Sequence, residues 1–458
     1  MIFLRDRLAG VVHGIRYADL PPEVIHQVKR ITLDTLACAF GASRSEPARI
    51  VREMARESGG TPACTLIGTA DKTSCALATL VNGTLMRYLD GNDYYFGRDS
   101  AHPSGNLAPA LAVAQRAGRN GRDLIAAMVI AYEIQLRLCD LTGVSERGWH
   151  PGTHTQFSSA ALAARLLSDD VAVTANAIAI AASHNNTLAQ SQRGHIPMMK
   201  ATAEAMISKG GVEAALLACR GLTGPEEIFE GAAGWRKIVA GELDADLLTA
   251  PCKGRFRIME ACFKPYAAVA GAMAPIQAAI DLATKHAIDA GAIEQIIIKL
   301  PASAAKKASG DPKKLAPRDK ETADHSFQYC VAVALLDKAC GEAQFTDAKL
   351  TSPQVRELIA RTRVEADEAL TALYPGSSGG GVTVRLRGGK AFEQLYSYPP
   401  GHPRNPGSDA DIERKFFALS GDVLTRSAAQ AVMDATWRLE ACENLQSFAL
   451  NGSPPCPS

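Results

Sequence analysis

Residues 121–140 read GRDLIAAMVIAYEIQLRLCD, and the pattern within them decides the fold of most of the chain. The positions that would face a core recur every three to four residues, which is the period of an α-helix. These positions are Leu124, Met128, Ala131, Gln135 and Leu138. A glycine begins this stretch and another ends the one before it, where helices commonly stop. The stretch is therefore predicted to be one helix of a helical assembly.

Four neighbouring stretches have the same character. Helices are predicted over residues 107–118, 158–167, 174–183 and 199–220, which are rich in alanine, leucine and isoleucine. Small side chains are frequent in the second of these, which favours closely packed helices. The first 262 residues are therefore predicted to form an all-helical domain.

The pattern changes near Pro265. Residues 293–300 (IEQIIIKL) have the density of β-branched side chains that is typical of a strand. Apolar residues then alternate over 382–386, and Gly388-Gly389 offers a turn into the run 392–398, so a hairpin is predicted. This region is expected to contain a sheet.

Helical patterns over 323–337 and 353–362 lie between the predicted strands, which makes the region α+β. Residues 399–411 (PPGHPRNPGSDAD) read as a loop, and the chain after them reads as helical again to about residue 445. The fold class is therefore expected to be mainly α, with a large all-helical domain and a smaller α+β domain. The expected segments are a helical part at 1–262, the α+β domain at 263–405 and a helical return at 406–458.

Composition excludes several classes of function. The 458 residues are 47% hydrophobic and 21% charged, with a formal net charge of +1, so neither nucleic acid nor a membrane surface is an expected partner. The first apolar run breaks at Arg5, and the most apolar stretch, 172–182, is too short to cross a bilayer. None of the eleven cysteines forms a C-x-x-C pair, which disfavours disulfide scaffolds, zinc ribbons and iron–sulfur sites. A cytoplasmic location is expected.

The residues richest in possible chemistry are 88–109, YLDGNDYYFGRDSAHPSGNLAP. Asp90 and Asp93 are three apart, and two close carboxylates can divide acid and base roles between them. His102 follows in a predicted loop, where functional residues are frequent. The alternative is a solvated helix end with an ordinary loop histidine.

Several other ionisable residues are candidates. His150 and His154 have a spacing that can hold zinc, but Pro151 argues against a continuous helix and no third ligand is evident, so no metal site is predicted. A neutral His150 suits proton transfer better. Lys200 and Lys264 lie among apolar residues and could bind carboxylates, or extend to solvent from helix ends. Tyr329 could donate to a substrate or be a packed core residue.

Together these stretches resemble one family along nearly the whole chain, the MmgE/PrpD family. The resemblance rests on ordered motifs rather than on any one of them. They are Leu33-Asp34-Thr35-Leu36-Ala37, Leu89-Asp90-Gly91-Asn92-Asp93, His102-Pro103-Ser104, Trp149-His150-Pro151, Met199-Lys200, Gly221-Leu222-Thr223-Gly224-Pro225, His325-Ser326-Phe327-Gln328-Tyr329 and Gly401-His402-Pro403-Arg404.

The resemblance implies a helical domain with an α+β lid, an active site between them, a homodimer, and no metal or organic cofactor. It also implies a pocket that contains Asp90, Asp93, His102, His150, Lys200, Lys264 and Tyr329. Two positions depart from the family. Tyr94 stands where a small hydroxyl residue is frequent, and the run after Lys264 lacks a histidine that the family usually has.

The implied activity is that of a lyase on a small polycarboxylate, with 2-methylcitrate dehydratase-like loss of water as the leading hypothesis. Decarboxylation of the cis-aconitate type, epimerisation, and an inactive carboxylate-binding protein are the alternatives. His102 or Asp93 is expected to act as base and His150 as acid, with Lys200 stabilising charge. Carboxylates are expected to be held by a set of residues around them. This set is Asp90, Tyr94, Lys264, Tyr329 and Arg404.

Overall fold

A computed structural model describes residues 2–309 and 311–451. Most of its helices come from the first half of the chain and from the end. They are α1 (Leu4–Gly14), α2 (Pro22–Gly41), α3 (Glu46–Ser58), α4 (Cys75–Tyr88), α5 (Leu107–Ala117), α6 (Gly121–Leu141), α7 (Thr155–Leu167), α8 (Val171–His184), α9 (Met199–Ala218), α10 (Ala245–Leu248), α18 (Asp409–Ser420) and α19 (Arg426–Trp437). The mainly helical class predicted from the sequence is confirmed.

The middle of the chain adds a sheet with its own helices. These helices are α11 (Met273–Lys285), α12 (Ala302–Ser309), α13 (Lys320–Ala323), α14 (Phe327–Asp337), α15 (Asp347–Leu350), α16 (Pro353–Ala360) and α17 (Glu368–Leu373). The four strands, in spatial order, are β6 (Thr362–Ala366), β5 (Ile293–Leu300), β7 (Gly380–Leu386) and β8 (Ala391–Tyr396). Strand β5 is parallel to β6 and antiparallel to β7. Two short hairpins, β1–β2 (Cys64–Thr65 and Lys72–Thr73) and β3–β4 (Tyr95–Phe96 and Ser100–Ala101), lie outside this sheet.

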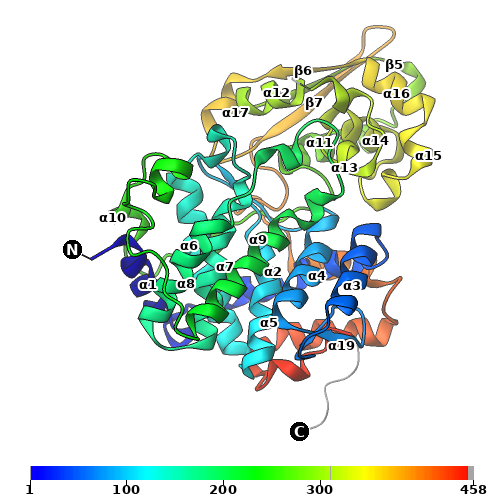
Figure 1. The fold of residues 1–458 in the computed structure, drawn as a ribbon. Helices are drawn as coiled ribbons and strands as arrows, with labels where there is room; N and C mark the ends of the chain where they lie inside the picture. Colours follow the sequence, from blue (N-terminus) through cyan, green and yellow to red (C-terminus); the bar gives the residue numbers. More distant parts are fainter. Residues whose placement is uncertain (1, 310, 452–458) are drawn as a thin grey trace.

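The end of the chain lies with its beginning. Figure 1 shows the sheet and its helices in the upper part, and the helices of the first half below, together with α19 (red), which packs against α2. Helix α18 packs along α2. Phe416 and Val432, near the end, belong to the same buried cluster as Leu8 and Leu36. The limits 262/263 and 405/406 stay a prediction as domain boundaries.

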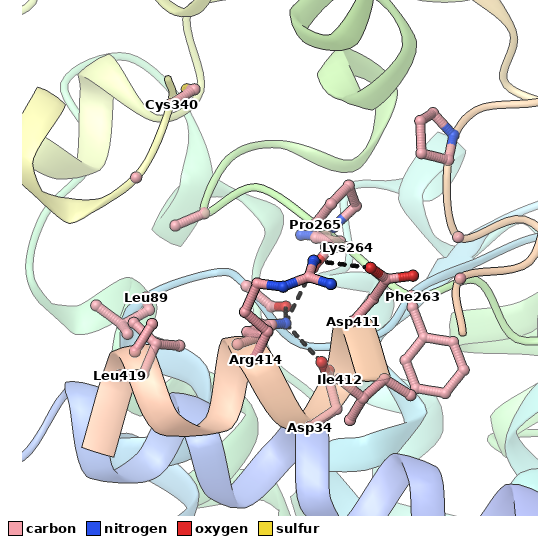
Figure 2. A pocket seen from close by; sticks show the side chains of 18 of the residues that line it. Asp34, Leu89, Phe263, Lys264, Pro265, Cys340, Asp411, Ile412, Arg414 and Leu419 are labelled. Atoms are coloured by element: carbon pink, nitrogen blue, oxygen red, sulfur yellow. Dashed lines mark hydrogen bonds and ion pairs between the residues drawn. The ribbon is translucent and has the colours of Figure 1, made fainter. Parts of the chain in front are cut away.

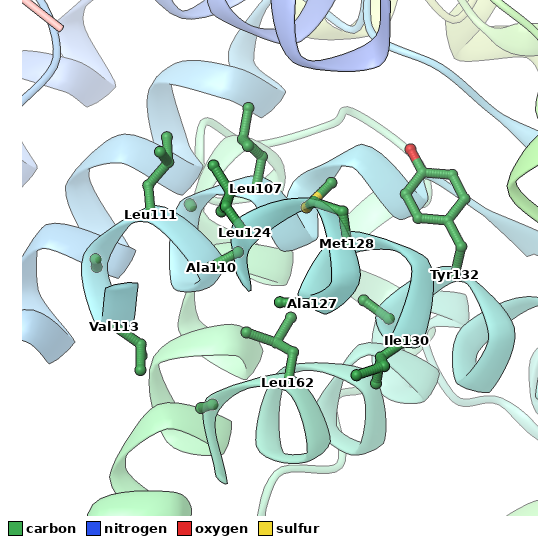
Figure 3. Close-up of a cluster of buried hydrophobic side chains, with 14 of the residues drawn as sticks. Leu107, Ala110, Leu111, Val113, Leu124, Ala127, Met128, Ile130, Tyr132 and Leu162 are labelled. Atoms are coloured by element: carbon green, nitrogen blue, oxygen red, sulfur yellow. The ribbon is translucent and has the colours of Figure 1, made fainter. Parts of the chain in front are cut away.

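Helices α5, α6 and α7 pack through apolar side chains that are fully buried. Figure 3 shows Leu111, Leu124, Met128 and Leu162 meeting between them. The stretch at 121–140 is a single helix, as predicted, and begins at Asn120, whose side chain accepts a hydrogen bond from the Asp123 amide. Such a cap satisfies an amide that the helix itself leaves unpaired. This core fixes the helices that carry the candidate site.

The second buried cluster lies between the sheet and helices α11 and α14. The pairing of Ile296 with Val384, and of Ile298 with Val382, places these apolar residues on one face. Helix α11 packs against β7 and β8, and α14 packs against α11. The predicted strand at 293–300 and the hairpin after it are therefore confirmed.

Two predicted helices differ from the structure. The helix predicted over 353–362 ends at Ala360, because Thr362–Ala366 pairs with β5 as an edge strand. The helix predicted over 323–337 is broken between α13 and α14, where the Ser326 hydroxyl accepts from the Tyr329 amide and starts a new helix. The break leaves Asp324 and His325 outside both helices.

Close packing of α9 against α7 gives a test of this architecture. A Cβ at Gly211 would meet the Ser159 hydroxyl at 2.1 Å and the Ala160 amide at 2.9 Å, so Gly211→Ala should destabilise the fold by about 1–3 kcal/mol. At Gly10 in α1 no described atom lies within 4 Å of the added Cβ, and Gly10→Ala should stabilise by about 0.5–1 kcal/mol. Calorimetric unfolding of both variants measures the difference. Equal stability of Gly211→Ala and the wild type would contradict the packing.

Candidate active site

The candidate site begins at the loop that follows α4. Asp90 lies just past the helix end with φ +51°, a left-handed conformation that residues other than glycine seldom adopt. Arg87, in the last turn of α4, hydrogen-bonds the side chain of Asn92 across this loop. Asn92 in turn donates to the Ser104 hydroxyl at 2.7 Å. The loop is therefore held at both ends, with the carboxylate of Asp90 between them.

Three cations surround the buried carboxylate of Asp90. Its Oδ1 lies 3.0 Å from the Lys264 ammonium and 3.3 Å from the Arg87 guanidinium, and its Oδ2 lies 3.5 Å from the Lys200 ammonium. Burial would raise the pKa of this carboxyl, but Lys200, Lys264 and Arg87 outweigh burial and hold the pKa well below its ordinary value. Asp90 is therefore a fixed anion.

His102 faces Asp90 as a neutral imidazole. Its Nδ1 is 2.8 Å from the carbonyl oxygen of Asp93, which can only accept, so Nδ1 carries the proton. Its Nε2, 3.9 Å from Asp90 Oδ1, is then the basic nitrogen. Burial, followed by the charges of Arg87 and Lys264, lowers the pKa of His102 well below its ordinary value. The ring is ready to accept a proton.

His325 faces Asp90 from the opposite side. Its Nδ1 donates to the carboxylate of Asp324, and its Nε2 lies 3.7 Å from Asp90 Oδ2. Asp324 also pairs with Lys320 at 2.8 Å. Burial, followed by the charge of Lys200, lowers the pKa of His325. The two histidines therefore present Nε2 atoms on both sides of one carboxylate.

His150 has the opposite tautomer. Its Nδ1 accepts a hydrogen bond from the Gly152 amide at 2.9 Å, so its proton is on Nε2. Burial lowers the pKa of this histidine to about 4. His150 is therefore a neutral hydrogen-bond donor. His154 is occupied elsewhere, because its Nε2 lies 2.7 Å from the Thr142 hydroxyl.

Lys200 is the least satisfied cation of the group. It lies in the first turn of α9, its side chain is 7% exposed, and its ammonium hydrogen-bonds no group in the described part of the chain. The nearest anions are Asp90 at 3.5 Å and Asp324 at 3.9 Å. A buried ammonium without hydrogen bonds is costly, so this atom is suited to an added anionic group.

A cavity of about 540 Å³ opens beside Asp90, His102 and His325. Charged side chains also line it, three of them basic and two acidic. They are Arg193, Lys307 and Lys314, with Asp90 and Asp311. The surplus of positive charge suits an anionic ligand.

The other end of the cavity is apolar. Tyr94 is 1% exposed and packs edge-on against Phe96, with ring centres 5.3 Å apart. Phe96 in turn lies against Tyr374, and these three rings form an aromatic wall. The apolar side chains of Phe327 and Val269 also line the cavity. Tyr94 therefore forms a side of the cavity and does not fill it.

Four sequence candidates have other surroundings. The Asp93 carboxylate accepts from the Ser104 amide and the Tyr132 hydroxyl, and Tyr329 donates to the Gln344 carbonyl at 2.6 Å. Arg404 is exposed and donates to Tyr398, while the three hydrogens of the Lys264 ammonium go to Asp90 and to the Ala268 carbonyl. None of the four is among the described residues that line the cavity, and neither are Lys200 and His150, which lie next to the lining residues Asp90 and Pro151.

Some residues of the cluster were not predicted as site residues. They are Arg87, Glu204, Asp324, His325 and Lys320. Arg87 and Glu204 form a buried pair at 2.6 Å between α4 and α9, and a charged residue on a helix gives no signal of such a pair in the sequence. His325 lies within one of the motifs of the sequence analysis, but the helix predicted over 323–337 is broken beside it, and His325 rather than Tyr329 lies near Asp90.

Residues 2–309 and 311–451 contain neither a metal-binding cluster nor a helix that could span a membrane. No group of three or more His, Cys, Asp or Glu side chains is arranged to hold a metal ion. No helix there is long and apolar enough to cross a bilayer.

The helical body, the small mixed sheet and the buried cluster of acid, imidazole and ammonium groups define a class of protein with a charged cavity for a small anion. Comparison with known sequences makes this specific. Residues 6–248 match the MmgE/PrpD N-terminal domain and residues 266–439 the MmgE/PrpD C-terminal domain. The chain belongs to the MmgE/PrpD family.

Three relatives illustrate the range of the family. The chain is 26% identical to a cis-aconitate decarboxylase of Mus musculus, over 96% of this chain and 91% of the relative. It is also 26% identical to that of Homo sapiens, over 99% and 95%. A 2-methylcitrate dehydratase of Cupriavidus necator is 28% identical over 70% of each chain.

The buried carboxyl of Asp93 gives a pH-dependent prediction. Burial raises its pKa to about 6, from an ordinary 3.8, so the folded chain binds this proton more tightly than the unfolded chain. Stability should therefore fall as the pH rises from about 4 to about 6, by about 3 kcal/mol for this group. Asp93→Asn keeps an acceptor for the Ser104 amide, and its own amide N–H can donate to the Tyr132 hydroxyl oxygen instead of accepting from it. The stability of the variant should not show this decrease between pH 4 and pH 6.

Urea unfolding at pH 4, 5, 6 and 7 measures the effect. Asp93→Asn should gain stability over the wild type at pH 7 and little at pH 4. Parallel curves for the two proteins would show that Asp93 does not carry the raised pKa.

Proposed function

We propose that this protein is a lyase that removes water from a small polycarboxylate, in the manner of a 2-methylcitrate dehydratase. One observation carries the proposal. His102 and His325 present basic Nε2 atoms on either side of the fixed anion Asp90, beside an ammonium, Lys200, that hydrogen-bonds no described group. The family and the printed names of its relatives support the class of substrate.

Substrate binding relies on the basic residues at the cavity. A polycarboxylate must lose water on entry, and charge-assisted hydrogen bonds compensate for that loss. Arg193, Lys307 and Lys314 line the cavity and are available for carboxylates. His150, which precedes the lining residue Pro151, adds a neutral N–H donor. These groups orient the acid with the carbon next to a carboxylate toward His102.

Proton removal begins at His102. Its Nε2 takes the proton from the carbon next to a carboxylate, and the resulting imidazolium is stabilised by Asp90 at 3.9 Å. The electron pair of the broken C–H bond forms the new double bond. The hydroxyl on the neighbouring carbon leaves with a proton from the Lys200 ammonium, as water.

The resting state is restored through Asp90. This carboxylate lies 3.9 Å from His102 and 3.5 Å from Lys200, so it lies between the group that gained a proton and the group that lost one. The proton on His102 passes to the Lys200 amine, whose charged form is stabilised by Asp90 at 3.5 Å. His325 offers a second base on the other side of Asp90 for a substrate of opposite configuration.

In this mechanism Lys200, and not His150, is the general acid. The sequence suggests it as a proton donor, but a pKa of about 4 leaves it neutral at pH 7. A neutral imidazole is a poor acid and a good hydrogen-bond donor. His150 is therefore assigned to stabilise negative charge on a substrate oxygen, as an electrostatic contribution.

Decarboxylation is the second candidate, because the mouse and human relatives are cis-aconitate decarboxylases. It needs one proton donor to the carbanion and no separate base. The pairing of a base, His102, with a donor cation, Lys200, favours elimination instead. An inactive binding protein is disfavoured, because the cavity beside Asp90 is open. The homodimer, the cofactor independence and the cytoplasmic location stay predictions.

Proton NMR in deuterated water tests the reaction. Metal-free protein is incubated with 2-methylcitrate, citrate and cis-aconitate, and an olefinic signal from the first acid is the expected result. His102→Gln should lower kcat by about 10²–10⁴ because the base is lost, and Lys200→Met by about 10²–10³. The exposed His184→Gln serves as control and should keep full activity.

The other outcomes are equally definite. Loss of carbon dioxide from cis-aconitate would assign a decarboxylase, and deuterium uptake without other change an epimerase. Full activity of both His102→Gln and Lys200→Met would overturn the assignment of residues.

The aromatic wall predicts a preference for a substrate with a hydrocarbon substituent. Burying one methyl group against Tyr94 and Phe96 should raise kcat/KM for 2-methylcitrate over citrate by about 10–200-fold. Tyr94→Ala should remove most of this ratio. Tyr94→Phe should keep this ratio, because the ring stays and the lost hydroxyl makes only a long contact, 3.5 Å, with Ser378. A ratio that is the same in Tyr94→Ala and Tyr94→Phe would place the methyl group elsewhere.

A further inference from the structure

Behind Asp90, on the side away from the candidate active site, lies a second cavity of about 590 Å³. Figure 2 looks into it and shows Asp34, Lys264, Leu89 and Leu419 around it, with helix α18 crossing below. Its lining includes a lysine from α18, Lys415, whose side chain is 17% exposed. The reaction proposed above does not use this residue.

Lys415 joins three segments that are far apart in sequence. Its ammonium donates to Asp34 Oδ1 at 2.6 Å, to the Gly91 carbonyl at 2.6 Å and to the Lys264 carbonyl at 2.9 Å. An ammonium has three hydrogens, and all three are used. Asp34 lies in α2, so Lys415 ties this helix to the two segments that form the wall between the cavities.

The contacts continue from Lys264 to Asp90. The Lys264 ammonium donates to the Asp90 carbonyl at 2.8 Å and lies 3.0 Å from its carboxylate. Lys415 therefore holds the backbone of Gly91 and Lys264, and Lys264 holds both the backbone and the side chain of Asp90. The two lysines close a ring of contacts around the residue with φ +51°.

We propose that Lys415 is a positioning residue for the active site, which keeps Asp90 in its left-handed conformation and so fixes its carboxylate between His102 and His325. The inference rests on the proposed function only for its effect on turnover. It also gives a role to the motif at residues 33–37, which the reaction leaves unexplained. Asp34 supplies the negative charge that pairs with the Lys415 ammonium, while the bonds from Lys415 to the two carbonyls hold the loop.

The physical reason is the cost of the Asp90 backbone. A non-glycine residue in the left-handed region costs about 1–3 kcal/mol and persists only where the surroundings impose it. Two charged donors supply this restraint: the Lys264 ammonium donates to the carbonyl of Asp90, and the Lys415 ammonium donates to the carbonyl of Gly91. Without Lys415, the segment at 264 and the loop at 90–91 lose their common anchor, and Asp90 is free to move from the histidines.

A bland alternative is that Lys415 and Asp34 form only a structural ion pair between α2 and α18. Variants of this pair separate the two roles. Asp34→Asn removes the anion and leaves the bonds from Lys415 to the carbonyls of Gly91 and Lys264. The double variant Asp34→Asn with Lys415→Met removes both charges, so no unpaired ion is buried, and it also removes the bonds to these carbonyls.

Lys29→Met is a matched control. Lys29 also lies in α2, and its ammonium pairs with Glu440 near the end of the chain at 2.9 Å. Its removal therefore breaks a comparable ion pair between the same parts of the molecule without touching the loop at 90–91.

For each protein we would measure thermal stability, kcat and KM for the acid found active, and the imidazole NMR signals of His102 and His325 without substrate. The double variant should lose about 100-fold in kcat, because a small displacement of a reacting group has an effect of that size, and KM should change little. The two imidazole signals should also move. Asp34→Asn and Lys29→Met should keep kcat and both signals near those of the wild type.

Equal kcat and unmoved imidazole signals in the double variant and in Asp34→Asn would overturn the proposal. If the wild type were inactive on every acid, the proposed function would fail, and the NMR signals alone would decide the role of Lys415. If the double variant did not fold, Lys415→Arg would replace it. A planar guanidinium keeps the charge toward Asp34 but cannot reproduce three tetrahedral donors, so kcat should fall at unchanged stability. Unchanged kcat would overturn the proposal.

Discussion

The structure depends on keeping one carboxylate ionised in its interior. Asp90 is 1% exposed, and an isolated anion at such a depth would take up a proton. It remains charged because Arg87 from α4, Lys200 from α9 and Lys264 from the segment before α11 all approach it. Each cation comes from a different element, so the electrostatic requirement of one residue also fixes where these elements meet.

The same charges set the chemistry of the histidines. Burial and nearby cations lower the pKa values of His102, His150 and His325, so all three are neutral near pH 7. Their hydrogen bonds then divide them into two kinds. His102 and His325 present a basic Nε2, whereas His150 presents an N–H. A site that holds a basic imidazole nitrogen and an imidazole N–H can remove a proton and stabilise the anion that results. The Lys200 ammonium, which hydrogen-bonds no described group, lies next to both kinds of imidazole and adds positive charge.

The sequence was most informative where the pattern is local. Helical periodicity at 121–140 and β-branched density at 293–300 each arise within one element, and both were predicted correctly. The edge strand at 362–366 was missed because it depends on pairing with β5, which is remote in sequence. Candidate residues followed the same rule. Asp90 and His102 lie in one loop and meet, while Tyr329 points away because Ser326 begins a new helix before it.

Lys415 is a residue that sequence reasoning could not find, because all three of its hydrogen-bond partners come from other parts of the chain. Lys415 lies more than 300 residues from Gly91 and 381 from Asp34, and it gives no local signal in α18. Its three bonds require the end of the chain to return to α2 after the region that contains the sheet. The helical return is thus needed for more than covering the core. It brings the Lys415 ammonium to the side of the 90–91 loop that faces away from the histidines. The two ends of the chain and the segment at Lys264 therefore all help to fix the position of the Asp90 carboxylate.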